Sequence, residues 1–484
     1  MEPPVFLGVD LGTSSVKVLA LTLEPVPRVA GRGRATYAIQ SPQPGWAEQD
    51  PKAWWRALRR ALHQALSGGI SQRVAAIGLS GQMHGVVLVD QAGALLYPAV
   101  IWADGRGASL LSAFRRKVPP PLWPRLGSPP APGLAALTLL WFRRHRPELL
   151  RKAAWALTPK DWLRLALTGE AGTEPSDASA TLLFSVPERV WDLEVIDRLG
   201  LEPTLLPPLQ RSDGLAGSLT SAAARYLGLP PGLPVIAGAA DQAAAALGNG
   251  ILREGQAQLM LGSGGQALSV RERPESDPTL KTHLFCHCLP GRWYRLGAVL
   301  NVGLAWSWLA QALGTTLEGF SRLARKAQAG AQGVVFYPYL LGERTPYMNP
   351  NLNAGWRSLR AYHTRAHLAR AGLEGIAFSL REAVEALDLT EGTPLRLAGG
   401  GIRDSFWLQI LADVLGRPLF PGLDPDASAW GAALLAALGV GCVEVWALEK
   451  LAIPSGPPVY PSDQAGFYGA FYREVWRAFW SPHP

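Results

Sequence analysis

A short polar segment near the N-terminus has the residue types of a phosphate-binding turn. It covers residues 10–17 (DLGTSSVK) and lies between two apolar, strand-like runs. The backbone N–H groups of a tight hairpin turn can point together toward an anion. Thr13 and Ser14 add hydroxyl donors, Lys17 adds a positive charge, and the Asp10 carboxylate could hold Mg²⁺ directly or through water. An ordinary hairpin is the alternative, because the Gly-x4-Gly-Lys-Ser/Thr pattern of a P-loop is missing.

Two glycine-rich turns in the second half suit the same class of ligand. Ser263 and Gly264 lie in a Gly-Ser-Gly-Gly turn between two strand-like runs and form a second candidate phosphate loop. Gly399 and Gly400 follow a strand-like run and precede a helical pattern that begins near Ser405. Glycine has no Cβ, so a flat nucleotide ring could approach this backbone closely. Each turn is common by itself, but the three in this order are not.

One acidic residue falls at the junction of the two halves of the chain. Asp241 follows the strand-like run 235–238 and starts an alanine-rich helix. An aspartate in this place can cap the helix. It can also act as a general base that accepts the proton of a substrate hydroxyl while that oxygen attacks phosphorus.

Two further segments could face a polyol. In residues 81–85 (GQMHG), His84 can hydrogen-bond sugar hydroxyls while Met83 packs on the carbon skeleton. In residues 102–106 (WADGR), the ring of Trp102 and the carboxylate of Asp104 could lie beside the same ligand. The structural alternatives are a core methionine with a turn histidine, and a turn with a surface ion pair.

The pattern of elements predicts two similar α/β domains, over residues 1–240 and 241–484. Each half contains a glycine-rich hairpin, and the first adds a helix after Asp50-Pro51, where Asp can cap and Pro fits the first turn. Residues 119–132 are rich in proline and indicate an irregular connection. Ligands favour the interface between such domains.

Composition excludes several classes of protein. The chain has 484 residues, 48% hydrophobic and 17% charged, and a net charge of +8 that suits anionic ligands. A run of Lys and Arg residues with interleaved aromatic residues would predict binding to nucleic acid, and the sequence contains none. The apolar stretch 427–443 is short for a ~20-residue membrane span and indicates a buried helix. Three cysteines and an N-terminus unlike a signal peptide predict a cytoplasmic protein.

These segments together resemble the FGGY family of carbohydrate kinases, and the resemblance runs nearly end to end. Many short motifs in the same order make a far more specific signal than any single motif does. The matching segments are 10–17, 46–51, 81–85, 102–106, 159–161, 241–242, 342–346, 399–403 and 430–433.

The resemblance implies a fold and a division of labour. The family fold consists of two ribonuclease-H-like domains, of the actin and hexokinase ATPase type, around a central cleft. By this resemblance, residues 1–240 are the sugar-binding domain and residues 241–484 the ATP-binding domain.

The resemblance also implies roles for individual residues. Asp241 would be the catalytic base and, with Asp10, would hold Mg²⁺. The sugar would be bound by Met83, His84, Trp102, Asp104, Asp241 and Gln242. ATP would be bound by Thr13, Ser14, Lys17, Ser263, Gly264, Gly303, Gly399, Gly400 and Asp404.

The implied reaction is ATP-dependent phosphorylation of D-xylulose to D-xylulose 5-phosphate, because the Met83-His84 pair matches the xylulose contact pair of the family. Alternatives are the same chemistry on another polyol, such as L-ribulose or glycerol, an actin-like ATPase that binds protein partners, and a catalytically quiet sugar-binding protein. The implied partners are a small sugar and Mg-ATP, with no nucleic acid and no membrane. The sequence does not define the oligomeric state, and a homodimer stays open.

Four positions depart from the usual family pattern. Gln242 stands where xylulose-specific members often carry Asn, and Ser263-Gly264 replace a Thr-Ser pair. Ala103 replaces an Asn, and Thr138 replaces a common Lys. None of these changes removes the predicted base or the predicted metal acid, and the sequence does not tell whether they alter specificity or rate.

Overall fold

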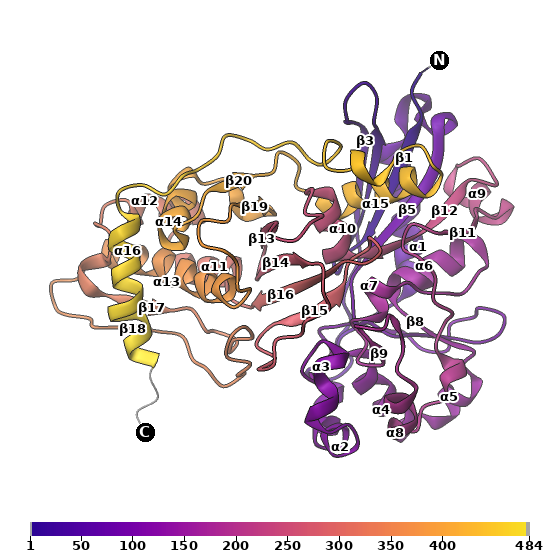
Figure 1. The fold of residues 1–484 in the computed structure, drawn as a ribbon, viewed down its shortest axis with the longest axis horizontal. Helices are drawn as coiled ribbons and strands as arrows, with labels where there is room; N and C mark the ends of the chain where they lie inside the picture. The colour runs from indigo at the N-terminus through magenta and orange to yellow at the C-terminus, as the bar shows by residue number, and fades with distance from the viewer. Residues whose placement is uncertain (1, 481–484) are drawn as a thin grey trace.

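Two six-stranded mixed sheets organise the chain (Figure 1). The computed structural model describes residues 2–480. The first sheet has the order β11-β12-β5-β1-β2-β3, with bounds Leu215–Ser218, Pro234–Ala240, Val74–Gly81, Val5–Leu11, Ser15–Thr22 and Arg28–Thr36. The second has the order β15-β16-β14-β13-β19-β20, with bounds His283–Cys286, Trp293–Val299, Gly265–Arg271, Ala257–Leu261, Leu395–Ala398 and Leu419–Pro421.

The two sheets repeat one plan. β1 pairs antiparallel with β2 and parallel with β5, and β13 pairs antiparallel with β14 and parallel with β19. A third antiparallel strand follows each hairpin, β3 in one lobe and β16 in the other. The two-domain α/β architecture predicted from the resemblance is therefore confirmed.

Helices cover both sheets. The longer ones are α1 Pro51–Ala65, α4 Ala135–His145, α6 Pro159–Thr168, α10 Asp241–Gly248, α11 Gly303–Ala312, α12 Leu317–Ala324, α13 Arg365–Glu385, α14 Ser405–Leu415 and α15 Ala427–Gly439. Shorter ones are α2 Leu111–Lys117, α3 Trp123–Leu126, α5 Pro147–Lys152, α7 Pro175–Ala178, α8 Leu193–Leu199, α9 Ser221–Leu227 and α16 Ala465–Phe471. No helix among residues 2–480 is long and apolar enough to cross a membrane.

Helix α1 shows how local chemistry sets an element. The Asp50 side chain accepts a hydrogen bond from the Lys52 N–H, and Pro51 opens the first turn. The helix packs closely on β3, because a Cβ on Gly33 would lie 1.8 Å from the Ala61 carbonyl oxygen. Gly68 follows with a φ of 73°, in the left-handed region that favours glycine.

Helices α10 and α15 join the lobes. α15 follows the last strand of the second sheet but lies over the first sheet (Figure 1), where a Cβ on Gly8 would meet the Ala429 carbonyl oxygen at 1.7 Å. α10 packs against α15 as closely, since a Cβ on Gly431 would lie 1.8 Å from the Ala244 carbonyl oxygen. These helices therefore fix the first residues of α10 between the two sheets.

The chain between β5 and β12 forms a helical insertion that also contacts the second lobe. The Leu284 N–H of β15 donates to the Gly127 carbonyl at 2.7 Å. Within the stretch predicted to be irregular, residues 120–122 form a 3₁₀ helix and residues 123–126 form α3. The difference arises because prolines at the first turn of a helix do not disrupt it.

Candidate active site

The ends of three parallel strands bring the predicted acids to one edge of the first sheet. Asp10 of β1 lies opposite Ser80 of β5 in the register. Ala239 of β12 lies opposite Ser80 on the other side of β5, and Asp241 follows two residues later. The carboxyl end of a parallel sheet is a favoured ligand position in α/β folds.

The Asp10 carboxylate is buried, and its neighbours offset its loss of hydration only in part. The Ser80 hydroxyl donates to its Oδ1 over 3.3 Å. Burial raises the pKa of the Asp10 carboxyl group, while the charge of Lys17 and the Ser80 bond lower it. The surroundings of the Asp10 carboxylate therefore favour the binding of a cation beside it.

Asp241 is half-buried and is the first residue of α10. The helix-cap interpretation does not hold, because Ala240 occupies the N-cap and makes no side-chain cap bond. Asp241 Oδ1 accepts the N–H of the next residue, Gln242, at 2.7 Å, and among residues 2–480 only the Gln242 side chain also hydrogen-bonds this carboxylate. Burial, followed by the charge of Asp10, raises the pKa of Asp241 to about 7.

Two such carboxylates suit Mg²⁺. They repel each other, and Asp10 is among the causes that raise the pKa of Asp241. Among the residues described, no group of three or more His, Cys, Asp or Glu side chains could hold a metal ion. Mg²⁺ is commonly bound by only one or two carboxylates together with waters and substrate phosphates, so this donor set fits it.

The first hairpin turn is braced from several sides. The Trp102 indole N–H donates to Thr13 Oγ1 at 2.9 Å, and Gln49 Nε2 donates to the Thr13 carbonyl at 2.7 Å. Lys17 Nζ lies 3.2 Å from Asp426, which comes from the loop before α15, while Ser14 is exposed. Trp102 therefore orients the Thr13 hydroxyl group, and the ion pair of Lys17 links the two halves of the chain.

Met83 and His84 follow β5 and lie close to the start of α10. Met83 is buried in the same apolar cluster as Ala240. His84 has a φ of 69°, and its Nδ1 lies 2.7 Å from the Ala180 carbonyl oxygen. Burial lowers the pKa of His84 to about 4, so the ring is neutral near pH 7. Nδ1 must donate to the carbonyl, which leaves Nε2 to accept from a hydroxyl group.

Asp104 is enclosed, only 2% exposed. Its Oδ2 accepts the Ala47 N–H at 2.6 Å, and its Oδ1 accepts Arg106 Nε at 2.7 Å. The Arg106 guanidinium group also pairs with Glu48 at 2.6 Å and lies 3.8 Å over the Trp46 ring. The ion pair in this turn is thus buried, not on the surface, and it stabilises the segment that carries Trp102.

A cavity of about 740 Å³ in the second lobe gathers predicted ATP-binding residues from three segments. Ser263 lies in the β13–β14 turn, Gly303 at the start of α11, and Gly400 and Asp404 between β19 and α14. Apolar side chains complete the lining, among them Trp306. The cavity thus offers hydroxyl and backbone groups beside an apolar wall.

The backbone in and around this cavity requires glycine at three positions. A Cβ on Gly303 would lie 2.6 Å from the Gly262 carbonyl oxygen. Gly399 has a φ of 93°, and a Cβ there would lie 2.4 Å from the Leu261 carbonyl oxygen. Gly264 likewise lies against a carbonyl, that of Val299, at 2.5 Å. Gly264 and Gly399 therefore shape the turns and are not among the lining residues.

Asp404 also has a structural role at the edge of the same cavity. Its Oδ1 accepts the Phe406 N–H at 2.9 Å and caps α14. Arg325 lies 3.3 Å from the same oxygen. The cap and the ion pair both fix this carboxylate at the cavity edge.

The two groups of predicted residues are connected through Gln242. Its Nε2 lies 4.0 Å from Met260 Sδ, on the strand that runs into the Gly262–Gly264 turn. Asp241 is therefore one residue from a direct contact with the strand that carries the second candidate phosphate loop.

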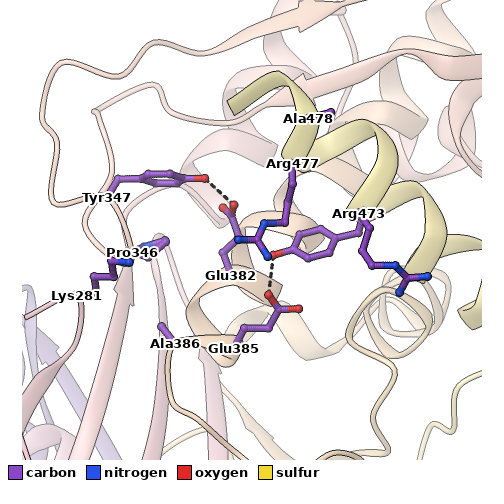
Figure 2. Close-up of a pocket in the computed structure, with 10 residues that line it drawn as sticks. Lys281, Pro346, Tyr347, Glu382, Glu385, Ala386, Arg473, Arg477 and Ala478 are labelled. Atoms are coloured by element: carbon purple, nitrogen blue, oxygen red, sulfur yellow. Dashed lines mark hydrogen bonds between the residues drawn. The ribbon is translucent and has the colours of Figure 1, made fainter. Parts of the chain in front are cut away.

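Figure 2 shows a different cavity in the second lobe, of about 520 Å³. It contains none of the predicted site residues. The Tyr347 hydroxyl group donates to Glu382 at 2.5 Å, and the Tyr472 hydroxyl group donates to Glu385 at 2.8 Å. Burial raises the pKa of Glu382 to about 7.

Sequence reasoning did not find the buried polar network beneath Asp241. Lys160, Glu174 and Ser176 are all fully buried, and the Ala240 N–H donates to Ser176 Oγ at 2.9 Å. Lys160 appeared only as part of a matching motif. Polar side chains within an otherwise buried helical stretch are the signal that could have revealed the network, since buried charges are normally paired.

Two duplicated α/β lobes, with a pair of acids at one sheet edge and a glycine-shaped cavity in the other lobe, define a phosphotransferase of the actin and hexokinase fold class. Residues 5–248 match the N-terminal domain, and residues 257–440 the C-terminal domain, of the FGGY family of carbohydrate kinases. The chain belongs to this family and is a sugar kinase.

Relatives over most of the chain are named xylulose kinases. The chain is 36% identical to the xylulose kinase of Escherichia coli K12 over 438 residues, 89% of each chain. It is 33% identical to that of Bacillus subtilis 168, covering 95% of this chain and 93% of the relative. The crystal structure of xylulose kinase from Rhodospirillum rubrum is 30% identical and covers 99% of both chains with a TM-score of 0.90.

Proposed function

We propose that this enzyme transfers the γ-phosphoryl group of ATP to the terminal hydroxyl group of D-xylulose and forms D-xylulose 5-phosphate. The observation that carries the proposal is that Asp10 near the end of β1, Met83 and His84 after β5, and Asp241 after β12 all follow the same ends of neighbouring parallel strands. The similarity to xylulose kinases over about 90% of both chains supports the choice of sugar.

In the proposed mechanism, Asp241 Oδ2 accepts the proton of O5 while O5 forms a bond to the γ-phosphorus and the bond to ADP breaks. A carboxyl group whose hydrogen bonds within the protein come only from Gln242 is available for this role. His84 Nε2 accepts a hydrogen bond from a sugar hydroxyl group, and Met83 packs beside the sugar carbons. The side chains orient the sugar so that its terminal oxygen faces the phosphorus.

The nucleotide is proposed to lie in the cavity formed by Ser263, Gly303, Gly400 and Asp404, with its phosphates toward the first hairpin. Asp10 and Asp241 would hold Mg²⁺, which supplies positive charge to the phosphate oxygens when bound. Lys17 and Thr13 would donate to the same phosphates. Because this chemistry needs ATP and the cysteines are free, we place the enzyme in the cytoplasm.

A coupled assay for ADP release with D-xylulose, L-ribulose and glycerol tests the proposal. We expect D-xylulose to give the highest kcat/KM. Preference for glycerol or L-ribulose would contradict the assigned substrate but keep the chemistry. ATP hydrolysis that does not depend on sugar, with nucleotide-dependent sedimentation, would instead favour an actin-like ATPase.

A further inference from the structure

The strand that ends at Asp241 is irregular just before it. The pairing of β12 with β5 is interrupted between Ile236 and Ala239, where Gly238 has a φ of 82°, and it resumes at Ala239 and Ala240. On the other side, the pairing with β11 ends at Ile236, and the N–H groups of Ala237 and Gly238 donate to the carbonyls of Gly214 and Ser212. The Ala240 N–H needs an acceptor from elsewhere, because a buried unpaired N–H is costly.

A serine side chain supplies this acceptor. Ser176, from the short helix α7, is fully buried, and its Oγ accepts the Ala240 N–H at 2.9 Å. The Ser176 hydroxyl group in turn lies 2.8 Å from both carboxylate oxygens of Glu174 and donates to them. Its lone pair is therefore directed at the peptide that immediately precedes Asp241.

Glu174 is itself held in one orientation. It accepts the N–H groups of Ser176 and Asp177 at 2.8 and 3.0 Å, and the Ser212 hydroxyl group at 2.6 Å. Lys160 Nζ lies 3.7 Å from Glu174 and 3.4 Å from the Ala237 carbonyl oxygen. The same buried cluster thus contacts the backbone on both sides of the irregularity at Gly238.

The position of this backbone matters because Asp241 is a side chain of only two rotatable bonds. Its carboxylate has no side-chain donor of its own to fix it, apart from the neighbouring Gln242. A displacement of about 1 Å at a reacting group can cost about 10²-fold in rate.

We propose that Ser176 is a positioning residue, which holds the Ala240 peptide so that the Asp241 carboxylate faces the sugar hydroxyl group. The inference rests on the proposed role of Asp241 as the base. Lys160 and Glu174 are not among the main causes of the pKa shift of Asp241. The effect passes through the backbone hydrogen bond.

A double-mutant cycle tests the proposal. We expect Ser176→Ala to lower kcat by about 10-fold, within the range for a misplaced catalytic group, and to leave the dissociation constants of ATP and sugar nearly unchanged. In an Asp241→Asn background, the same change should cause no further loss, measured as transfer of labelled phosphate to D-xylulose.

Ser179→Ala is the matched control. Ser179 lies one residue beyond α7, is 1% exposed, and its hydroxyl group donates to the Ser176 carbonyl at 2.9 Å. It has no contact with Ala240 among its hydrogen bonds. We expect this variant to keep its kcat even if its melting temperature falls as much as that of Ser176→Ala.

The outcomes separate the two proposals. An equal fold-loss from Ser176→Ala in both backgrounds, or an unchanged kcat, would overturn the positioning role. Near-parental activity of Asp241→Asn alone would instead overturn the base assignment. If Ser176→Ala does not fold, Glu174→Gln removes an acceptor of the Ser176 hydroxyl group and is expected to give a smaller loss of kcat that again vanishes with Asp241→Asn.

Discussion

Asp241 and Glu382 both have a pKa near 7, for the same first reason but in different surroundings. Burial raises the pKa of Asp241 at the edge of the first sheet and of Glu382 in the second lobe. Both oxygens of Glu382 accept tyrosine hydroxyl groups, from Tyr347 at 2.5 Å (Figure 2) and from Tyr339 at 3.2 Å. Asp241 has a second acid, Asp10, within electrostatic reach, and among the residues described only Gln242 hydrogen-bonds its carboxylate.

The comparison teaches that a raised pKa does not by itself identify a catalytic group. A perturbed carboxyl group whose oxygens are all bonded within the protein has no place for a substrate proton. The acceptor capacity that the carboxylate oxygens keep for a ligand separates Asp241 from Glu382. Substitutions at these two carboxyl groups and their hydrogen-bond partners test whether this difference decides which carboxyl group is catalytic.

The largest expected effect is that of Asp241→Asn. An amide cannot accept the sugar proton, so we expect kcat to fall by about 10²–10⁴-fold while the enzyme still folds and binds ATP. Glu382→Gln is the matched control, since it makes the same type of change at the same pKa. Steady-state kinetics with D-xylulose measure both, and a similar loss in the two variants would refute the distinction.

The pH dependence gives the second effect. A base must be unprotonated, so kcat/KM for the sugar should fall as pH drops through about 7, by about 10-fold per pH unit well below it. Because the charge of Asp10 raises the pKa of Asp241, Asp10→Asn should move this acid limb to lower pH as well as reduce the rate. An acid limb that stays in place in Asp10→Asn would show that the two carboxyl groups do not interact.

Elements with strong local signals were predicted closely. The strand-like run before Gly399 is β19, and the helix predicted to begin near Ser405 is α14, because Asp404 caps that helix and Gly416, at a φ of 63°, ends it. The burial of helix α15 was predicted from its apolar composition. Its place over the first sheet was not, because an Ala-rich helix buried on all sides has no face that indicates a partner.

Partners distant in sequence account for what could not be predicted at the site. The ion pair of Lys17 with Asp426 joins residues from opposite ends of the chain, and neither has a local pattern that names the other. The donors around Glu382 come from separate segments, so the occupation of both its oxygens could not be predicted from the sequence. The hairpin geometry of residues 10–17 could be predicted, since the turn residues themselves set it.

The third prediction concerns stability and uses Glu382. A carboxyl group with a folded-state pKa of about 7, above its ordinary 4.5, binds more protons in the folded state between these values. Its contribution to stability is therefore full below pH 4.5 and is lost as pH rises through 7, on the order of 3 kcal/mol in all. The melting temperature of the parent should fall from pH 5 to pH 8 more steeply than that of Glu382→Gln. Parallel curves would contradict the assigned pKa.

Tyr347→Phe should give the smallest effect and a sign that depends on pH. The Tyr347 hydroxyl group lowers the pKa of Glu382 by donating to its charged form. Removing it should raise that pKa further and cost about 1–3 kcal/mol at pH 8, where the carboxylate is charged, but less at pH 5, where it is protonated. Tyr472→Phe, which breaks the equivalent bond to the more exposed Glu385, is the control and should cost less at both pH values. Chemical unfolding at the two pH values measures both variants, and kcat should not change, because this cavity holds none of the groups proposed to contact sugar or phosphate. A loss of kcat in Tyr347→Phe at full stability would make Glu382 part of the catalytic apparatus and end the distinction from Asp241.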